Sequence, residues 1–285
     1  MAAMASLRFH QFTDTHLYAA ATGAMRGQQT LPSFVSALQQ AAGFPAPTAL
    51  LLTGDLVHDE PAGYAHLHTL LGASPVPVHL IPGNHDDPAA LAASFAAPLA
   101  APSAAQLAEP ATVTPSSATS PASTASPFLL GGSHRYSAGD NRWLVVMLST
   151  HAAGRVDGEL GPTALAELER TLVAAGGMNT LLVLHHPPVA VGSAWLDEIG
   201  LADAAAFWEV LDPHANVRGV LWGHAHQAFE GQRGSVRLMG TPSTCLQFLP
   251  GSADFALDTR GPGWRWLELH ADGRIDSQVE WVPPA

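Results

Sequence analysis

The chain has 285 residues, 47% of them hydrophobic, which is enough for a large core and allows one or two domains. Its net charge is −12, and its 12 basic residues are all arginines without a basic stripe, so we expect no long nucleic acid as a partner. The single cysteine, Cys245, excludes an intrachain disulfide, and no apolar run approaches the ~18 residues of a membrane span. With no signal-peptide pattern at the start, these features predict a cytoplasmic protein that does not contact a membrane.

The first part of the chain alternates apolar runs with helical patterns. A helix is expected to begin near Leu31, with Thr30 as its cap, because apolar residues then recur at the spacing of one helix face. Gly43 and Pro45 end it. The other elements expected here are strands at 7–12, 49–52 and 76–81 and helices at 62–71 and 88–97.

Residues 98–127 differ from the rest of the chain. They are nearly all Ala, Pro, Ser and Thr, with one charged residue, Glu109. Because such a segment has little to bury and many prolines, it is predicted to be a flexible surface insertion, with a docking linker as the alternative. Strand patterns and polar motifs continue after it, so it is not interpreted as a domain boundary.

The second part of the chain has the same alternation at first and then a run of strands. A helix is expected from Gly161, another is expected to be capped by Asp203, and 194–197 is interpreted as a loop. Strands are expected at 143–148, 181–184, 217–222, 236–239, 264–269 and 279–282. The last strands are separated by turns such as Asp272-Gly273 and are expected to form a second sheet or its edge. The whole pattern predicts two sheets packed face to face with helices outside.

Polar residues suited to catalysis follow five of these strands, and open α/β sheets place their sites outside strand carboxyl ends. His224 and His226 lie at i and i+2, which in extended backbone point the same way, so one metal site is expected to receive both. Gly54 permits close approach of backbone or ligand beside Asp55. The full set is Asp14, His16, Asp55, Asn84, His85, His185, His224 and His226.

The donors in this set are oxygen and imidazole nitrogen, without thiolate, which favours Mn, Fe, Zn or Co. One carboxylate can bridge two ions roughly 3.5–4 Å apart, and a paired site suits phosphate chemistry. Such ions bind phosphoryl oxygens and lower the pKa of a bound water, whose hydroxide attacks phosphorus. His85 is the candidate that stabilises or protonates the leaving alkoxide. A hydrogen-bonded histidine cluster without metal is the alternative.

The motifs D-x-H, G-D, G-N-H-D, H-H-P-P and G-H-x-H, in this order, resemble those of the calcineurin-like metallophosphoesterases. Within that family the chain is similar to the bacterial class III 3′,5′-cyclic-nucleotide phosphodiesterases, through the strings 11–17, 54–57, 82–86, 193–197 and 240–248. The resemblance covers most of the chain. It implies a single α/β domain over residues 1–285, folded as a four-layer α-β-β-α sandwich of two mixed sheets flanked by helices. The segment 98–127 would be an insertion into this domain.

The resemblance also implies a role for each residue in a centre of two metal ions, Fe and Mn, with Zn or Co as alternatives. Asp55 would bridge the two ions. The first ion would be held by Asp14, His16 and His226, and the second by Asn84, His185 and His224. His185 is chosen over His186 because the family ligand lies two residues before a proline, and Pro187 fits. Asp86 is expected to orient His85 or its loop.

The expected catalytic residues are His85, Asp55 and Asn84. The expected substrate-binding residues are Asn84, His85, Arg26 and Trp195, with Asp197 and Phe248 as further pocket candidates. Trp195 and Phe248 would stack on a purine, or are packing residues. The favoured function is hydrolysis of 3′,5′-cyclic AMP to 5′-AMP by a metal-bridging hydroxide. The alternatives are a broader phosphodiesterase acting on 2′,3′-cyclic nucleotides or glycerophosphodiesters, and a non-catalytic metal-binding scaffold. The expected partner is a small-molecule phosphodiester, and the chain is expected to be a monomer or homodimer.

Overall fold

A computed structural model describes residues 6–95 and 126–283. The insertion predicted at 98–127 therefore lies outside the described residues, apart from its last two positions. None of the helices in the described ranges is both long enough and apolar enough to cross a bilayer.

Twelve strands form two six-stranded mixed sheets. The first sheet has the order β14 (Ile275–Trp281), β13 (Gly263–Leu269), β1 (Leu7–Phe12), β4 (Ala49–Thr53), β5 (Val78–Ile81) and β6 (Phe128–Leu130). The second has the order β11 (Phe229–Arg233), β12 (Val236–Gly240), β10 (Val217–Trp222), β9 (Asn179–Val183), β8 (Asn141–Met147) and β7 (Gly132–Ala138). Strands β1, β4, β5 and β6 run parallel to one another, as do β8, β9, β10 and β12.

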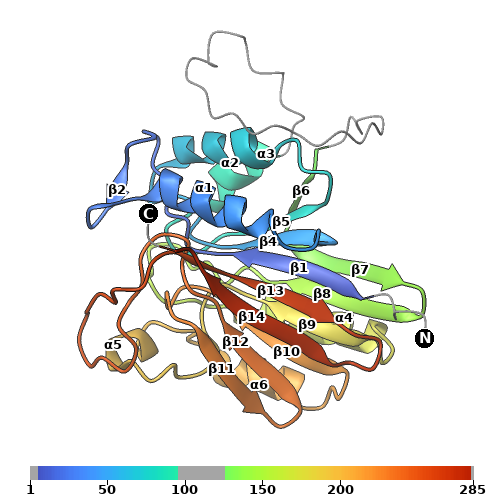
Figure 1. The fold of residues 1–285 in the computed structure, drawn as a ribbon. Coiled ribbons are helices and arrows are strands. Elements are labelled where there is room, and N and C mark those ends of the chain that lie inside the picture. The colour runs from blue at the N-terminus through green and yellow to red at the C-terminus, as the bar shows by residue number, and fades with distance from the viewer. Residues whose placement is uncertain (1–5, 96–125, 284–285) are drawn as a thin grey trace.

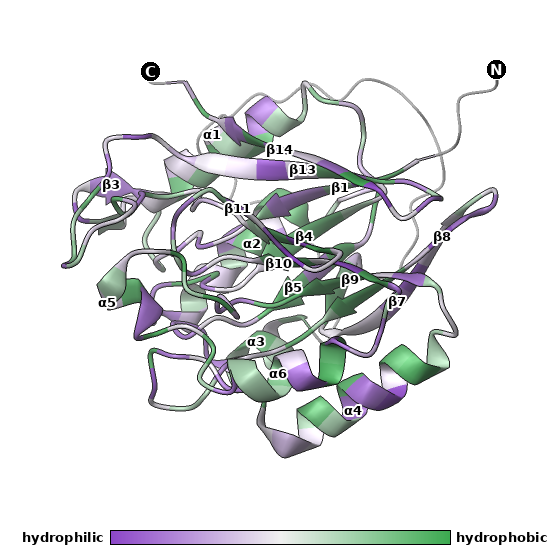
Figure 2. Cartoon of the chain, turned by 90° about the horizontal axis from the view of Figure 1, so that it is seen from below, coloured by the Kyte–Doolittle hydropathy of each residue, from purple (hydrophilic) through white to green (hydrophobic). Residues whose placement is uncertain are grey.

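Helices cover the outer face of each sheet, so the chain forms four layers (Figure 1). α1 (Thr30–Ala41), α2 (Tyr64–Leu71) and α3 (Pro88–Phe95) pack on the first sheet, and α4 (Gly161–Ala174) and α6 (Ala204–Leu211) pack on the second. Three buried apolar clusters fill the spaces between the layers, and the middle one joins the two sheets through residues such as Phe9, Leu51 and Leu221. The inner strands β4, β5 and β9 are mostly hydrophobic, whereas α4 carries both apolar and polar stretches (Figure 2). The predicted four-layer α-β-β-α fold is confirmed.

The C-terminal strands divide between the two sheets, which differs from the prediction. β13 and β14 form a hairpin whose first strand pairs antiparallel with β1, where Arg8 contacts Glu268 at 2.8 Å. β12 pairs instead with β10 in the second sheet. The apolar pattern of a strand records which face is buried, but not which distant strand becomes its neighbour. The sequence therefore predicts the existence of these strands but not their sheet.

Three local predictions are corrected by the backbone. Thr30 is the first residue of α1 rather than its cap, and Gln29 occupies the N-cap position without a side-chain bond. Asp203 does stand at the N-cap of α6, but its carboxylate accepts hydrogen bonds from the backbone of Leu160 and Gly161, where α4 begins. Residues 194–197 form the short helix α5 (Ala194–Asp197) rather than a loop. The short strands β2 (Ala24–Met25) and β3 (Gln28–Gln29) form a small hairpin that belongs to neither main sheet.

Candidate metal centre

The predicted site residues follow the carboxyl ends of five strands. β1, β4 and β5 are neighbours in the first sheet, and β9 and β10 are neighbours in the second. Because parallel strands end at the same edge, each sheet presents its group of side chains together. The two groups meet, since Asp55 Oδ1 from the first sheet lies 3.4 Å from His185 Nε2 of the second. The centre is therefore built by both halves of the sandwich.

The first set of side chains is Asp14, His16 and His226. His226 Nε2 lies 3.3 Å from Asp14 Oδ1 and 3.1 Å from His16 Nε2, and all three residues are buried. One carboxylate oxygen and two imidazole nitrogens thus converge within the distance of a single ion's ligand shell.

The second set contains His185, His224 and Asn84. Asn84 Oδ1 lies 3.0 Å from His224 Nδ1, and the nitrogens of His185 and His224 lie within 4.8 Å of each other. Asp55 stands between the sets, with Oδ2 3.7 Å from His16 Nε2 and Oδ1 facing His185. A single carboxylate facing both sets has the arrangement that a bridging ligand requires.

Hydrogen bonds fix which imidazole nitrogen is available as a ligand. His226 Nδ1 donates to the carbonyl of Leu246 at 2.7 Å, and His185 Nδ1 donates to the carbonyl of Thr53 at 2.8 Å. Each bond leaves the Nε2 lone pair free and directed into the centre. His185 Nε2 and His224 Nε2 are buried and have no hydrogen-bond partner among the described residues, which fits nitrogens that ligate a metal.

The backbone at these positions is in the left-handed region. Asp14, His16, Asp55, His224 and His226 all have φ between 45° and 61°, a conformation that costs of order 1–3 kcal/mol each in a residue other than glycine. His224 and His226 are therefore not extended, and the expectation that one site receives both because they point the same way is wrong. The turn between them sends His224 to the second set and His226 to the first.

Glycines make room for the crowded side chains. A Cβ at Gly83 would lie 2.2 Å from Asp55 Oδ1, and a Cβ at Gly223 would lie 2.0 Å from Thr13 Oγ1. Gly54 has φ +94°, and a Cβ there would lie 2.4 Å from His185 Nδ1. The close approach predicted beside Gly54 is thus made by the ring of His185.

The electrostatics of the centre couple buried carboxylates to imidazoles. Burial would raise the pKa of Asp14, but His226 outweighs it and holds that pKa below its usual value. Burial is likewise outweighed at Asp55, where His185 and His16 hold the pKa of the carboxyl well below its normal range. Burial and the neighbouring His185 lower the pKa of His224 to about 3, so its imidazole is neutral at pH 7, as a ligand must be.

His186 is buried beside His185 but has both ring nitrogens engaged. Its Nε2 lies 3.1 Å from the carbonyl of Val156, and its Nδ1 lies 2.7 Å from Thr150 Oγ1. Because Nε2 must donate to the carbonyl, Nδ1 accepts from the threonine hydroxyl and has no lone pair left. This geometry favours His185 as the ligand.

Asp86 supports the loops rather than His85. Its carboxylate accepts hydrogen bonds from the backbone of Leu56, Val57 and Gly83 and from the hydroxyl of Tyr64. Burial and the nearby Asp55 raise the pKa of Asp86 to about 6. The carboxylate that contacts His85 is that of Asp59, whose Oδ1 lies 3.0 Å from His85 Nδ1. The alternative in which Asp86 orients the loop fits these contacts, whereas orientation of His85 belongs to Asp59.

The predicted substrate residues form a group beside the centre. The ring of Phe248 stacks on His226 with centroids 4.2 Å apart, and Trp195 lies edge-on to Phe248 at 5.1 Å. Arg26 is exposed and lies 4.8 Å over the ring of Phe255. Asp197 is committed elsewhere, because its carboxylate accepts hydrogen bonds from the backbone of residues 191 and 192.

Sequence reasoning missed three residues here. His58, Asp59 and Phe255 are not among the predicted site residues. His58 lies against His16 and His85, Asp59 contacts His85, and Phe255 packs against Trp195 and is itself 44% exposed. For His58 and Asp59 a signal was present, since both follow Asp55 within four residues.

The residues present fit a pair of metal ions. Two buried carboxylates face four histidines, one carboxylate faces both sets, and two buried nitrogens lack hydrogen-bond partners among the described residues. The donors are oxygen and nitrogen without sulfur, which suits Mn, Fe, Zn or Co. A hydrogen-bonded histidine cluster would leave no such nitrogens orphaned.

Comparisons with known proteins agree with this reading. The family model of the calcineurin-like phosphoesterases matches residues 7–228. The chain is 35% identical over 278 residues to a protein of Vibrio vulnificus named 3′,5′-cyclic adenosine monophosphate phosphodiesterase CpdA, covering 96% of this chain and 90% of the relative. A protein of the same name from Pseudomonas aeruginosa is 34% identical, covering 98% of this chain and 91% of the relative.

Solved structures share the fold at low sequence identity. A dimetal phosphatase from Danio rerio is 14% identical with a TM-score of 0.58, covering 97% of this chain and 99% of that chain. GAP50, described as the anchor in the inner membrane complex of Plasmodium, is 12% identical with a TM-score of 0.62. The match covers 97% of this chain and 85% of that chain. The fold thus serves both a phosphatase and an anchor, so the fold alone does not decide the function. The family model and the close relatives do decide the family, and they confirm the predicted assignment to a metal-dependent phosphoesterase. The chain belongs to the calcineurin-like phosphoesterases.

Proposed function

We propose that the chain hydrolyses 3′,5′-cyclic AMP to 5′-AMP at a centre of two metal ions, with Fe and Mn as the expected pair. The observation that carries the proposal is the position of Asp55, one buried carboxylate that faces both sets of ligands. The names of the relatives, which are identical to this chain at about one position in three over nearly its full length, support the substrate.

In this proposal the side chains divide into two sets. Asp14, His16 and His226 would hold one ion, Asn84, His185 and His224 would hold the other, and Asp55 would contact both. When bound, the ions supply positive charge for the phosphoryl oxygens and make a water acidic enough to attack phosphorus at neutral pH. Asn84 contributes a neutral oxygen, which limits the negative charge at the place where an anionic phosphodiester must enter.

His85 serves the leaving group. Its backbone nitrogen donates to Asp55 Oδ1 at 2.9 Å, which fixes the residue against the centre, while its side chain remains 30% exposed. Asp59 accepts from Nδ1, so Nε2 is the atom that faces a substrate. A ring placed in this way can stabilise or protonate the alkoxide that leaves when the cyclic ester opens.

The aromatic group beside His226 would receive the base. Trp195, Phe248 and Phe255 lie edge to face with centroids 5.1–5.5 Å apart, and Trp195 Nε1 is buried without a partner among the described residues. Phe248 is stacked on His226 and only 8% exposed, so the exposed ring of Phe255 is better placed to stack on a purine. Arg26, which joins no ion pair in the described part of the chain, stands over Phe255 and offers a cation beside the bound nucleotide.

The test is a substrate panel run on protein whose metal content has been measured. Protein stripped of metal and reloaded with Mn²⁺, Fe²⁺, Zn²⁺ or Co²⁺ is assayed against 3′,5′-cyclic AMP, 2′,3′-cyclic AMP, a glycerophosphodiester and an aryl phosphodiester. We expect 3′,5′-cyclic AMP to have the highest kcat/KM. Poor turnover of it beside good turnover of the other esters would favour the broader phosphodiesterase. Two bound metals without turnover of any ester would favour the scaffold.

A variant pair tests the base-binding group. Phe255→Ala is expected to raise KM for cyclic AMP about tenfold, because base–aromatic stacking is worth ~1–3 kcal/mol, and to leave KM for an aryl phosphodiester unchanged. Leu257→Ala is the control, since Leu257 lies in the same loop and is equally exposed at 44%. Equal effects of the two variants would remove Phe255 from the base site.

A further inference from the structure

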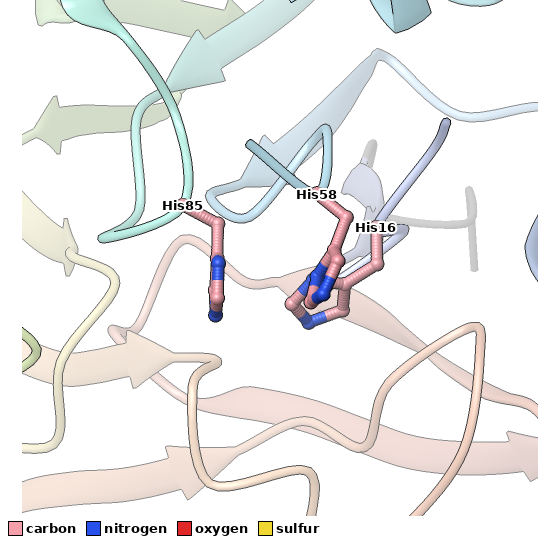
Figure 3. Close-up of side chains that lie close together, drawn as sticks. All are labelled: His16, His58 and His85. Atoms are coloured by element: carbon pink, nitrogen blue, oxygen red, sulfur yellow. The ribbon is translucent and has the colours of Figure 1, made fainter. Parts of the chain in front are cut away.

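His58 lies at the rim of the centre, outside the two proposed sets of ligands, and contacts His16 and His85. His58 follows the parallel bridge between Leu17 and Val57, and its backbone nitrogen donates to the carbonyl of Leu17 at 3.1 Å. The next residue donates from its backbone to the carbonyl of His85 at 3.3 Å. These bonds hold His58 between the loops that carry His16 and His85, and Figure 3 shows the three side chains converging from those loops.

The ring of His58 is a hydrogen-bond partner of His16. The two Nδ1 atoms lie 3.1 Å apart, so one nitrogen carries the hydrogen and the other accepts it. His16 Nε2 lies 3.1 Å from His226 Nε2 and faces Asp55, so a His16 that ligates through Nε2 carries its hydrogen on Nδ1. His58 Nδ1 is then the acceptor. His226 and His185 donate to backbone carbonyls instead, so the tautomer of His16 depends on a side chain.

The same ring also packs on His85. The centroids of His58 and His85 are 4.6 Å apart with 26° between the ring planes, which is a stacked contact. Asp59 restrains one edge of His85 through Nδ1, and His58 restrains its face. Together they leave the ring of His85 little freedom to turn.

These contacts do not make a third metal site. An imidazole holds an ion in the plane of its ring at about 2.0–2.1 Å. Two rings stacked face to face cannot direct their lone pairs at one ion, although their nitrogens lie within 4.8 Å of those of His16. The geometry suits a residue that supports its neighbours.

We infer that His58 is a positioning residue with two separable tasks: its Nδ1 fixes the tautomer of His16 toward the first metal, and its ring face orients His85 toward the leaving group. The inference rests on the proposed function for the second task only. The first task concerns metal retention and holds for any phosphoester substrate. Partners that orient a histidine ligand typically change metal affinity 10–100-fold when they are replaced.

Two substitutions separate the tasks. In His58→Asn the side-chain oxygen is as many bonds from Cα as Nδ1 is, so it keeps the acceptor and loses the stacked ring. In His58→Phe the ring remains and the acceptor is lost. His214→Asn and His214→Phe are the controls, because His214 is a partly buried histidine that contacts Glu169 away from the centre.

The first measurement is the rate at which loaded protein loses metal to a chelator, which needs no substrate. We expect His58→Phe to lose one ion per chain about 10–100-fold faster than wild type, and His58→Asn to lose it at nearly the wild-type rate. Equal metal loss in wild type and His58→Phe would overturn the first task. If His58→Phe does not fold, faster metal loss from folded His58→Asn would overturn it, because that variant retains the acceptor.

The second measurement is kcat and KM at saturating metal, with cyclic AMP and with an aryl phosphodiester. We expect His58→Asn to lower kcat about tenfold or more with KM unchanged, and His58→Phe to keep kcat within about twofold of wild type. Unchanged kcat in His58→Asn, or equal falls in both variants, would overturn the second task. A wild type that retains two metals but does not turn over cyclic AMP would contradict the proposed function and leave the chelator result standing.

Discussion

Asp55 is the residue at which the two halves of the centre meet. Its two oxygens face histidines from different sheets, and its pKa is held well below normal by those neighbours, so it is an anion at neutral pH. A carboxylate shared by two ions makes the binding of each depend on the other. The loss of this one side chain should therefore affect both ions.

Replacing Asp55 with alanine is expected to reduce the metal content from two ions per chain to less than one and to abolish turnover. Elemental analysis of the purified protein measures this. Asp59→Ala is the control for metal content, because the carboxylate of Asp59 is 69% exposed and contacts His85 rather than a proposed ligand. A D55A protein that kept two ions would show that the bridge is wrongly assigned.

Replacing His85 with alanine should separate chemistry from metal binding. The backbone bond from residue 85 to Asp55 survives the change, so both ions are expected to remain. A fall in kcat of ~10²–10⁴-fold is expected, since the leaving group loses its proton donor or charge stabiliser. Steady-state kinetics with a parallel metal assay tests this, and unchanged turnover would remove His85 from the mechanism.

At the scale of single residues, the sequence predicted that these side chains would lie close together, because each follows the end of a strand within a few residues. It did not predict their conformations or their supports. His224 and His226 have left-handed backbone, and the backbone nitrogen of His224 donates to the carboxylate of Asp14, which follows a strand of the other sheet. Asp59 closely follows Asp55 in the sequence, but nothing there indicates its partner, His85, which is 26 residues away. Contacts between loops of this kind have no local signature.

At the scale of elements, the centre depends on strands that end in tight turns. Gly83 illustrates this, because φ there is not positive and alanine is conformationally allowed, yet a Cβ would lie 2.2 Å from Asp55 Oδ1 and 2.6 Å from His185 Nε2. The glycine is needed for the space beside it. The turn after β5 and the carboxylate after β4 can approach each other only without a side chain at this position.

Gly83→Ala is accordingly expected to weaken metal binding by tenfold or more while the chain still folds. Metal titration of the stripped protein measures the affinity. Gly43→Ala is the matched control. A Cβ there would meet the backbone oxygen of Gln40 at 3.3 Å, and Gly43 is far in the sequence from the residues of the centre. An unchanged affinity in G83A would show that the turn can shift without cost.

The sequence also predicted the strands better than the sheets. Apolar runs identified β1, β4, β9 and β10, since each is buried on both faces. The mostly exposed β7 and β11 were missed, because polar strands at sheet edges carry no such run. The placement of β13 beside β1 brings together residues more than 250 positions apart, as at Leu7 and Leu269, and nothing local encodes that.

At the scale of the whole molecule, the two sheets are held together by an apolar core that also contains a neutral histidine. His79 is fully buried on the face of β5 that it shares with Ile81, a residue of the inter-sheet cluster, and it contacts the hydroxyl of Tyr136 on β7. Burial, aided by the neighbouring His134, lowers the pKa of His79 from 6.5 to about 3. At a pH between these two values, His79 is therefore neutral in the folded state and protonated in the unfolded state.

Stability should fall as the pH drops from about 6.5 toward about 3, because in that window the unfolded chain binds a proton at His79 that the folded chain does not. Above this window both states are neutral, and the penalty is absent. His79→Gln is expected to reduce the slope of unfolding free energy against pH by up to about 1.4 kcal/mol per pH unit. Urea unfolding at several pH values measures the slope, and identical slopes for both proteins would contradict the assignment.

The participation of both sheets in the centre has a consequence for synthesis. The first set of proposed ligands joins Asp14 and His16 to His226, and the second joins Asn84 to His185 and His224. A chain still emerging from the ribosome therefore has neither set complete until its last quarter is made. Its early carboxylates and histidines are exposed to metal long before their partners exist. We therefore expect tight retention of both ions only in chains that have been synthesised past His226.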